Sequence, residues 1–62
     1  MNYAKVKPQK LGGWMAELAI NDKRKKTTYH TLEGSRTRDE IIDRIQKFAE
    51  INNLPNGFII TY

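Results

Sequence analysis

The chain has 62 residues, enough for one domain near the lower size at which a single hydrophobic core supports a fold. It carries 11 Lys and Arg against 7 Asp and Glu, with no cysteine and one histidine. This composition excludes disulfides, thiolate zinc sites and cysteine nucleophiles, and the length leaves no room for a cleft between lobes. We therefore expect a single small domain over residues 1–62 that is not an enzyme and has no catalytic residues, metal or cofactor.

The sequence contains no recognisable targeting signal. No apolar run approaches the ~18 residues that a membrane helix needs, and residues 1–7 lack a hydrophobic signal region. Small secreted domains usually rely on disulfides, which a chain without cysteine cannot form. We expect a cytoplasmic protein with no membrane partner.

The first expected strand covers residues 3–7, where Ala and Val alternate with Tyr and Lys. Pro8 ends this run, and because proline cannot donate a hydrogen bond to a neighbouring strand, an edge or terminal position is favoured. Gly12 and Gly13 then turn the chain toward the next element.

A β-hairpin is expected next. Residues 14–20 alternate between apolar and other side chains, residues 21–24 are typical of a turn, and residues 25–32 are rich in Thr and Tyr, as strands are. The apolar face of the first of these strands carries Trp14, Ala16, Leu18 and Ile20.

The cost of burying charge predicts the register of this hairpin. We expect Ile20 to face Lys25, Leu18 to face Thr27 and Ala16 to face Tyr29. A slip by one residue would bring Lys26 and His30 into the core, where an unpaired ammonium costs far more than a threonine. The outer face of the hairpin then carries Met15, Glu17, Ala19, Arg24, Lys26, Thr28 and His30.

The helix is predicted by its start, its periodicity and its end. Residues 37–40, Thr-Arg-Asp-Glu, fit a capping box, and acidic residues in the first turn suit the helix dipole. The sequence Asn-Asn at 52–53, followed by Pro55, ends it. Residues 58–62 are then expected to form a short final strand. The apolar stripe of the helix consists of Ile41, Ile42, Ile45, Phe48 and Ala49.

The element order is therefore β-β-β-α-β, in the α+β class. We expect a three-stranded antiparallel sheet packed on one helix, with a short C-terminal strand. One face of the sheet is left open, which antiparallel sheets tolerate.

Positive charge is concentrated in the first half of the chain. Residues 1–38 hold nine Lys and Arg against three acidic residues, whereas residues 39–62 hold two against four. Spaced cations on an open sheet suit the phosphates of a nucleic acid, and Thr and His add hydrogen bonds. Duplex DNA is preferred to RNA because this face is expected to offer few aromatic side chains for stacking. The predicted nucleic-acid-binding residues are Lys5, Lys7, Arg24, Lys26, Thr28 and His30.

The pattern Gly-Trp-Met-Ala-Glu-Leu at 13–18, then a polar turn, then Arg-Lys-Lys-Thr-Thr-Tyr at 24–29 and a capped helix, resembles a known family. It is similar to the AP2-type DNA-binding modules, including the N-terminal arm-binding domains of phage and transposon tyrosine recombinases, over about residues 3–50. The resemblance implies that the sheet inserts into the major groove of DNA. Residues 58–62 form an extra element that those modules generally lack. The resemblance assigns the contacts to Met15, Glu17, Arg24, Lys26, Thr28 and His30.

A second hypothesis is a protein-binding module, encoded by a phage or mobile element, that inhibits or adapts a host protein through an acidic surface of that partner. An exposed edge strand, either residues 3–7 or residues 58–62, would extend a partner's sheet or form a homodimer. The apolar composition of the last strand favours this hypothesis. Its predicted interaction edge consists of Phe58, Ile60 and Tyr62.

Overall fold

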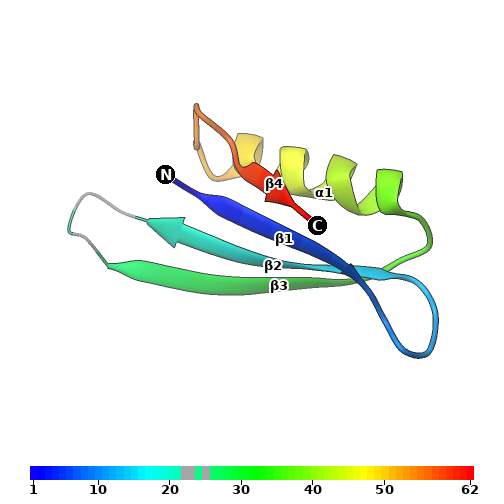
Figure 1. Cartoon of the computed structure of the whole chain (residues 1–62). Coiled ribbons are helices and arrows are strands. Elements are labelled where there is room, and N and C mark those ends of the chain that lie inside the picture. Colours follow the sequence, from blue (N-terminus) through cyan, green and yellow to red (C-terminus); the bar gives the residue numbers. More distant parts are fainter. Residues whose placement is uncertain (22–23, 25) are drawn as a thin grey trace.

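One helix lies across one face of a mixed four-stranded sheet in the computed structural model, which describes residues 1–21, 24 and 26–62 (Figure 1). The elements are β1 (Tyr3–Pro8), β2 (Trp14–Asn21), β3 (Thr27–Ser35), α1 (Arg38–Ile51) and β4 (Ile59–Thr61). The chain therefore has the predicted α+β class and element order.

The strands lie in the order β3-β2-β1-β4. β1, β2 and β3 are antiparallel neighbours, as expected, but β4 pairs parallel to β1 and makes the sheet mixed. The predicted edge position of the first strand was wrong, because β1 has a partner on both sides. Pro8 is compatible with this central position because it is the last residue of β1, opposite Trp14, beyond the part of β1 that pairs with β4.

The predicted register of the β2–β3 hairpin was also wrong, by three positions. Leu18 faces His30 rather than Thr27, and Ile20 faces Thr28 rather than Lys25. Partners across an antiparallel pair share a face. Thr28 and His30 therefore lie on the side of the sheet that α1 covers, and Tyr29 lies on the open side.

The error has a physical cause. The prediction assumed a tight turn at residues 21–24, whereas β2 extends to Asn21 and β3 begins only at Thr27. Lys26 lies outside β3, so its ammonium group stays out of the core in the observed register and charge does not decide the pairing. Residues 22, 23 and 25, which belong to the predicted turn and to the predicted Ile20 pairing, lie outside the described residues.

A β-bulge ends β3. Trp14 faces Ser35 while Ala16 faces Leu32, so that two residues of β3 lie opposite Met15 alone. Gly34 has φ +82°, which suits a bulge position. Ser35 is consequently 1% exposed.

Arg44 links the helix to this bulge. Its Nη1 donates to the Ser35 hydroxyl at 2.9 Å and to the Glu33 carbonyl oxygen at 2.6 Å. The Arg44 side chain is partly buried. A buried hydroxyl without a partner would destabilise the fold, so this contact supports the position of α1 as well as the bulge.

The core is small and lies between α1 and the central strands. Six fully buried side chains form its centre: Ala4, Val6, Ala16, Leu18, Ile41 and Ile45. Two of these are alanines of neighbouring strands, and small side chains let a helix approach a sheet closely. Partly buried residues surround this centre: Trp14, Leu32, Ile42, Phe48, Phe58 and Ile60. The predicted helix stripe and the inward position of Trp14 agree with this arrangement.

Both helix ends have the predicted caps. The Thr37 hydroxyl accepts a hydrogen bond from the Glu40 amide at 3.1 Å. After Ile51, Asn53 adopts φ +55°, and the Leu54 amide donates to the Ala49 carbonyl at 2.9 Å. These contacts satisfy backbone groups that a helix terminus leaves without partners.

Gly13 provides a test of how closely the β1–β2 loop approaches the bulge. It has φ +86°, and a Cβ there would lie 2.8 Å from the Ser35 carbonyl oxygen. We predict that Gly13→Ala lowers the free energy of unfolding by about 3 kcal/mol, measured by urea titration. Gly12→Ala is the matched control, because φ is +97° but no atom lies within 4 Å, and it should cost about 1 kcal/mol. Equal losses of stability would contradict the steric explanation.

Candidate nucleic-acid interface

The face of the sheet opposite α1 is called the open face here. The strand registers assign its side chains, because paired residues share a face. Outside the terminal Asn21–Thr27 pair, the open face consists of Tyr3, Lys5, Lys7, Met15, Glu17, Ala19, Tyr29, Thr31, Ile59 and Thr61.

One row across the open face is apolar and aromatic. Ile59 pairs with Tyr3, Tyr3 with Ala19, and Ala19 with Tyr29. Tyr3 is 44% exposed, Tyr29 78% and Ile59 42%. Ala19 places only a methyl group between the two tyrosines, and the Tyr3 hydroxyl donates to the Met1 sulfur at 3.8 Å. We call the four paired residues the tyrosine row.

The next row along the strands is charged. Lys5 lies opposite Glu17, and Lys7 forms an ion pair with Glu17. The hydrogen bond and charge of Lys7, with a smaller effect of Lys5, hold the pKa of Glu17 below its ordinary value. Glu17 is therefore ionised at neutral pH, so two lysines and one carboxylate leave a single excess positive charge on this part of the open face.

The six residues predicted to bind nucleic acid do not form one surface. Lys5 and Lys7 lie on the open face, as predicted. Thr28 and His30 do not, because they lie on the helix face, where the His30 ring packs against Phe48 at 4.9 Å between centroids.

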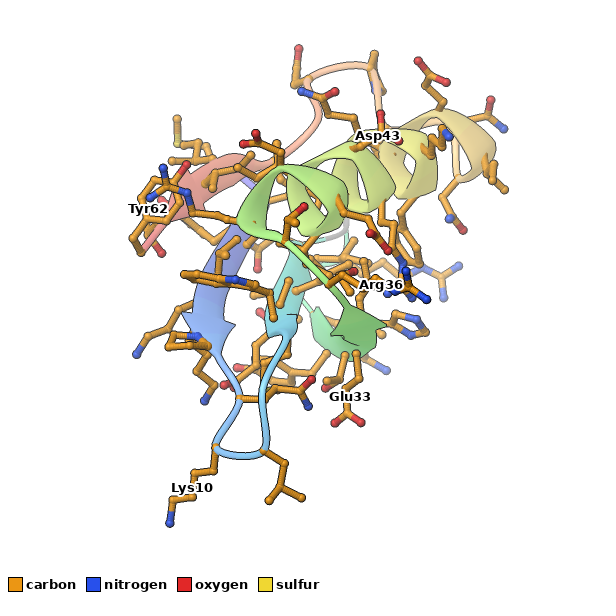
Figure 2. All side chains as sticks on the ribbon, turned by 90° about the vertical axis from the view of Figure 1, so that its right-hand side faces the viewer. Lys10, Glu33, Arg36, Asp43 and Tyr62 are labelled. Atoms are coloured by element: carbon orange, nitrogen blue, oxygen red, sulfur yellow. The ribbon has the colours of Figure 1, made fainter. Side chains whose placement is uncertain are left out.

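Arg24 and Lys26 lie in the connection between β2 and β3 and are exposed. This connection follows Asn21, two residues beyond Ala19, so it is at the end of the sheet nearest the tyrosine row. Lys10 lies at the opposite end, at the tip of the β1–β2 loop (Figure 2). The positive charge is therefore spread along the length of the sheet.

The three residues of the predicted interaction edge differ in their exposure. Phe58 and Ile60 are partly buried against the core, and β4 pairs with β1 of the same chain. Tyr62 is 70% exposed, and the Arg38 guanidinium lies 5.0 Å from its ring centre (Figure 2). Of these three side chains, only Tyr62 is on the surface.

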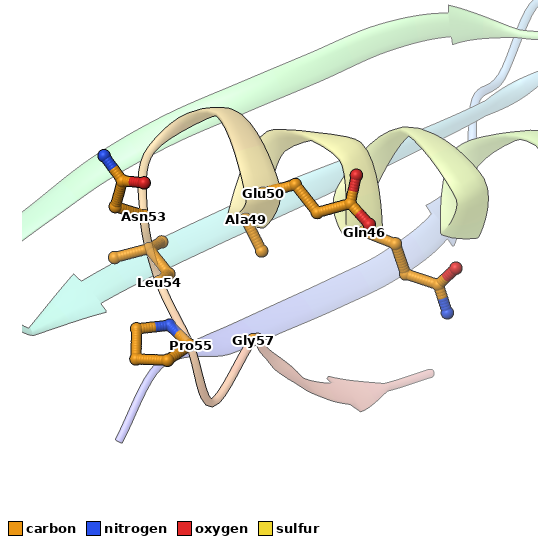
Figure 3. A pocket seen from close by; sticks show the side chains of 7 residues that line it. All are labelled: Gln46, Ala49, Glu50, Asn53, Leu54, Pro55 and Gly57. Carbon is orange, nitrogen blue, oxygen red and sulfur yellow. The ribbon is translucent and has the colours of Figure 1, made fainter.

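A groove of about 640 Å³ runs between the C-terminal half of α1 and residues 53–57 (Figure 3). Ala49, Leu54 and Pro55 give it apolar walls, and Glu50 is its one ionisable lining residue. General acid–base or nucleophilic chemistry needs several positioned groups, which this lining does not supply.

No three His, Asp or Glu side chains in the described part of the chain are grouped as ligands for a metal ion. No helix in residues 1–21 or 26–62 has the length and apolar character to cross a bilayer.

Comparisons of this chain with protein-family models, with curated proteins and with solved structures find no match. The resemblance to AP2-type modules therefore stays a prediction.

Tyr3 was expected on the open surface beside the lysines of the first strand, although not among the binding residues, whereas Tyr29 was expected in the core. The predicted register started from the turn and placed Tyr29 in the core. Leu32 carries the better signal, because it is the one large aliphatic residue of β3 and must point inward. Counting back from Leu32 in steps of two gives His30 and Thr28 inward, and Tyr29 outward.

The ion pair on the open face predicts a pH dependence. Because the pKa of Glu17 is lowered in the folded protein, its contribution to stability is present above the ordinary value of 4.5 and is lost as the pH falls through the lowered pKa. We predict that Lys7→Met moves the Glu17 pKa back toward 4.5, and that Lys5→Met moves it less, in an NMR titration of the carboxyl carbon. A larger effect of Lys5→Met would show that Lys5, and not Lys7, is the main partner of the carboxylate.

Proposed function

We propose that this protein is a non-catalytic nucleic-acid-binding domain that uses the open face of its sheet. The observation that carries the proposal is the tyrosine row with cations on both sides along the strands. Lys5 and Lys7 follow it on β1, and Arg24 and Lys26 lie at the end of the sheet next to it. Rings that accept stacked bases, flanked by groups that pair with phosphates, are complementary to the chemistry that nucleic acids present.

Phosphate contacts supply the salt-dependent part of the affinity in this proposal. Lysine and arginine that neutralise phosphates release condensed counterions, and binding weakens as salt concentration rises. Glu17 opposes this effect, because it pairs with Lys7 and repels phosphate. The carboxylate thereby weakens binding that depends only on the charge of the phosphate backbone. Discrimination between ligands then depends more on the tyrosine row.

The proposed site differs from the sequence-based set. It keeps Lys5, Lys7, Arg24 and Lys26 and adds Tyr3 and Tyr29. The helix-face residues Thr28 and His30 are left out because they do not share the open face. The preference for duplex DNA assumed a face with few aromatic side chains for stacking, whereas two exposed tyrosines lie in one row of the open face.

Charge substitutions on the two faces of the molecule test the proposal. We predict that Lys5→Glu weakens binding of a labelled oligonucleotide in fluorescence anisotropy. The slope of log K against log salt should become shallower by roughly 0.7 to 0.9 for each phosphate that the variant no longer neutralises. Glu17→Gln should strengthen binding and steepen the slope, because it frees Lys7 from its carboxylate partner.

Lys47→Glu is the matched control. Lys47 lies on α1, where it pairs with Asp43 at 3.1 Å, and its substitution changes the net charge by the same amount as Lys5→Glu. It should leave binding nearly unchanged. Equal effects of the two substitutions would mean that net charge alone drives association, and no binding at low salt would overturn the proposal.

A second candidate function is sheet-to-sheet association with a protein partner, including a second copy of this chain. The observation that favours it is the outer edge of β3, because β2 is its one neighbour in the described part of the sheet. Its first six residues, Thr-Thr-Tyr-His-Thr-Leu, contain no Lys, Glu or Asp, the side chains that usually protect an edge from pairing. Of the two edges predicted from the sequence, residues 3–7 form an inner strand, whereas β4 is the other outer strand of the described sheet; β3 is the longer of the two observed edges.

A size measurement separates this candidate from the first. If β3 pairs between copies, the protein is a dimer at high concentration in analytical ultracentrifugation, and Thr28→Lys makes it monomeric by placing a charge on the edge. Thr28 lies away from the open face, so the same variant should bind oligonucleotide normally. A monomer at all concentrations would exclude self-association through β3.

A further inference from the structure

We infer that the nucleic acid bound by the open face is single-stranded, with its bases stacked on Tyr3 and Tyr29. This inference rests on the proposed function and specifies the ligand class of the same site. Each of its three supports is a separate property of the open face: ring exposure, sheet width and the placement of cations.

The rings of Tyr3 and Tyr29 are exposed on the open face. Tyr29 is 78% exposed and Tyr3 44%, although tyrosine in a sheet normally packs part of its ring against larger neighbours. Ala19 lies between them in the same row and covers neither ring. With neighbouring strands ~4.8 Å apart, the two rings are separated by roughly 10 Å, which leaves room for one base on each.

Duplex nucleic acid does not present what these rings bind. The faces of its bases are stacked within the helix, and only unpaired bases can lie on an aromatic side chain. The width of the sheet also opposes its insertion into the major groove of a duplex. The tyrosine row spans four strands, about 14 Å between the outer strand axes, whereas the major groove is about 12 Å wide and admits a two-stranded ribbon.

The cations are placed for a backbone that passes over the tyrosine row. Lys5 is two residues from Tyr3 on β1, about 7 Å along the strand, and it points to the same face. Arg24 and Lys26 lie beyond the row at the other side. A strand whose bases occupy the row therefore has phosphate partners before and after it. Since the charged row holds one excess positive charge, stacking has to supply much of the affinity.

The test compares three labelled ligands at one salt concentration by fluorescence anisotropy: oligothymidine and oligouridine of about 20 nucleotides, and a duplex of the same length, each longer than the span that one small domain covers. We expect both single strands, or one of them, to bind more tightly than the duplex. The two single-stranded arms distinguish DNA from RNA as the source of the same chemistry.

Substitutions at Tyr29 identify the interaction. Tyr29→Ala should weaken single-strand binding about 10-fold or more, Tyr29→Leu should weaken it nearly as much, and Tyr29→Phe should retain it, because stacking needs the ring and not its hydroxyl or apolar area. Tyr62→Ala is the matched control, since Tyr62 is 70% exposed but contacts Arg38 instead of lying on the open face. Circular dichroism checks that each variant is folded.

The outcomes separate this inference from the proposed function. Tighter binding of the duplex, or equal effects of Tyr29→Ala and Tyr62→Ala, would overturn the single-strand inference and leave nucleic-acid binding intact. The same holds if Tyr29→Leu binds as well as the natural protein, because apolar contact would then replace stacking. Absence of binding to all three ligands would overturn both.

Discussion

The position of β3 against β2 determines which side chains this protein shows to its surroundings. Leu32 lies opposite Ala16 and faces the helix, and the bulge at Gly34 brings Ser35 opposite Trp14. Because side chains alternate along a strand, placing Leu32 inward places Tyr29 outward. The open face, with its two exposed tyrosines, therefore follows from the need to bury one leucine and to hydrogen-bond one serine to Arg44.

The same arrangement explains why one face is left uncovered. Fourteen residues form the only helix of the described chain, and its buried positions, Ile41, Ile45 and Ala49, cover one side of the sheet. The core centre contains two alanines and one valine among six residues, so half of it consists of small side chains. A domain with so little burial has no second layer to protect the other face, and the residues there are free to serve binding.

Local sequence signals predicted local structure well. The helix limits followed from Thr37 and the Asn-Asn pair at 52–53, because caps act through contacts within a few residues. Non-local features were harder. The position of β1 in the centre depends on pairing with β4 at the other end of the chain, and the β2–β3 register depended on a connection length that charge does not fix. The candidate site inherited that error, so the outward side chains of β1 were placed correctly while Tyr29 was assigned to the core.

The pairing of β4 with β1 has a kinetic consequence. Tyr3 and Ile59 are partners although they lie at opposite ends of the sequence, whereas the β1–β2 and β2–β3 pairs close short loops. Closing a longer loop costs more entropy, so the antiparallel meander is expected to assemble first and β4 to dock last. With three residues in that strand, undocking of β4 is then the lowest-energy opening of the molecule, and it would expose the far side of β1 while the meander stays folded.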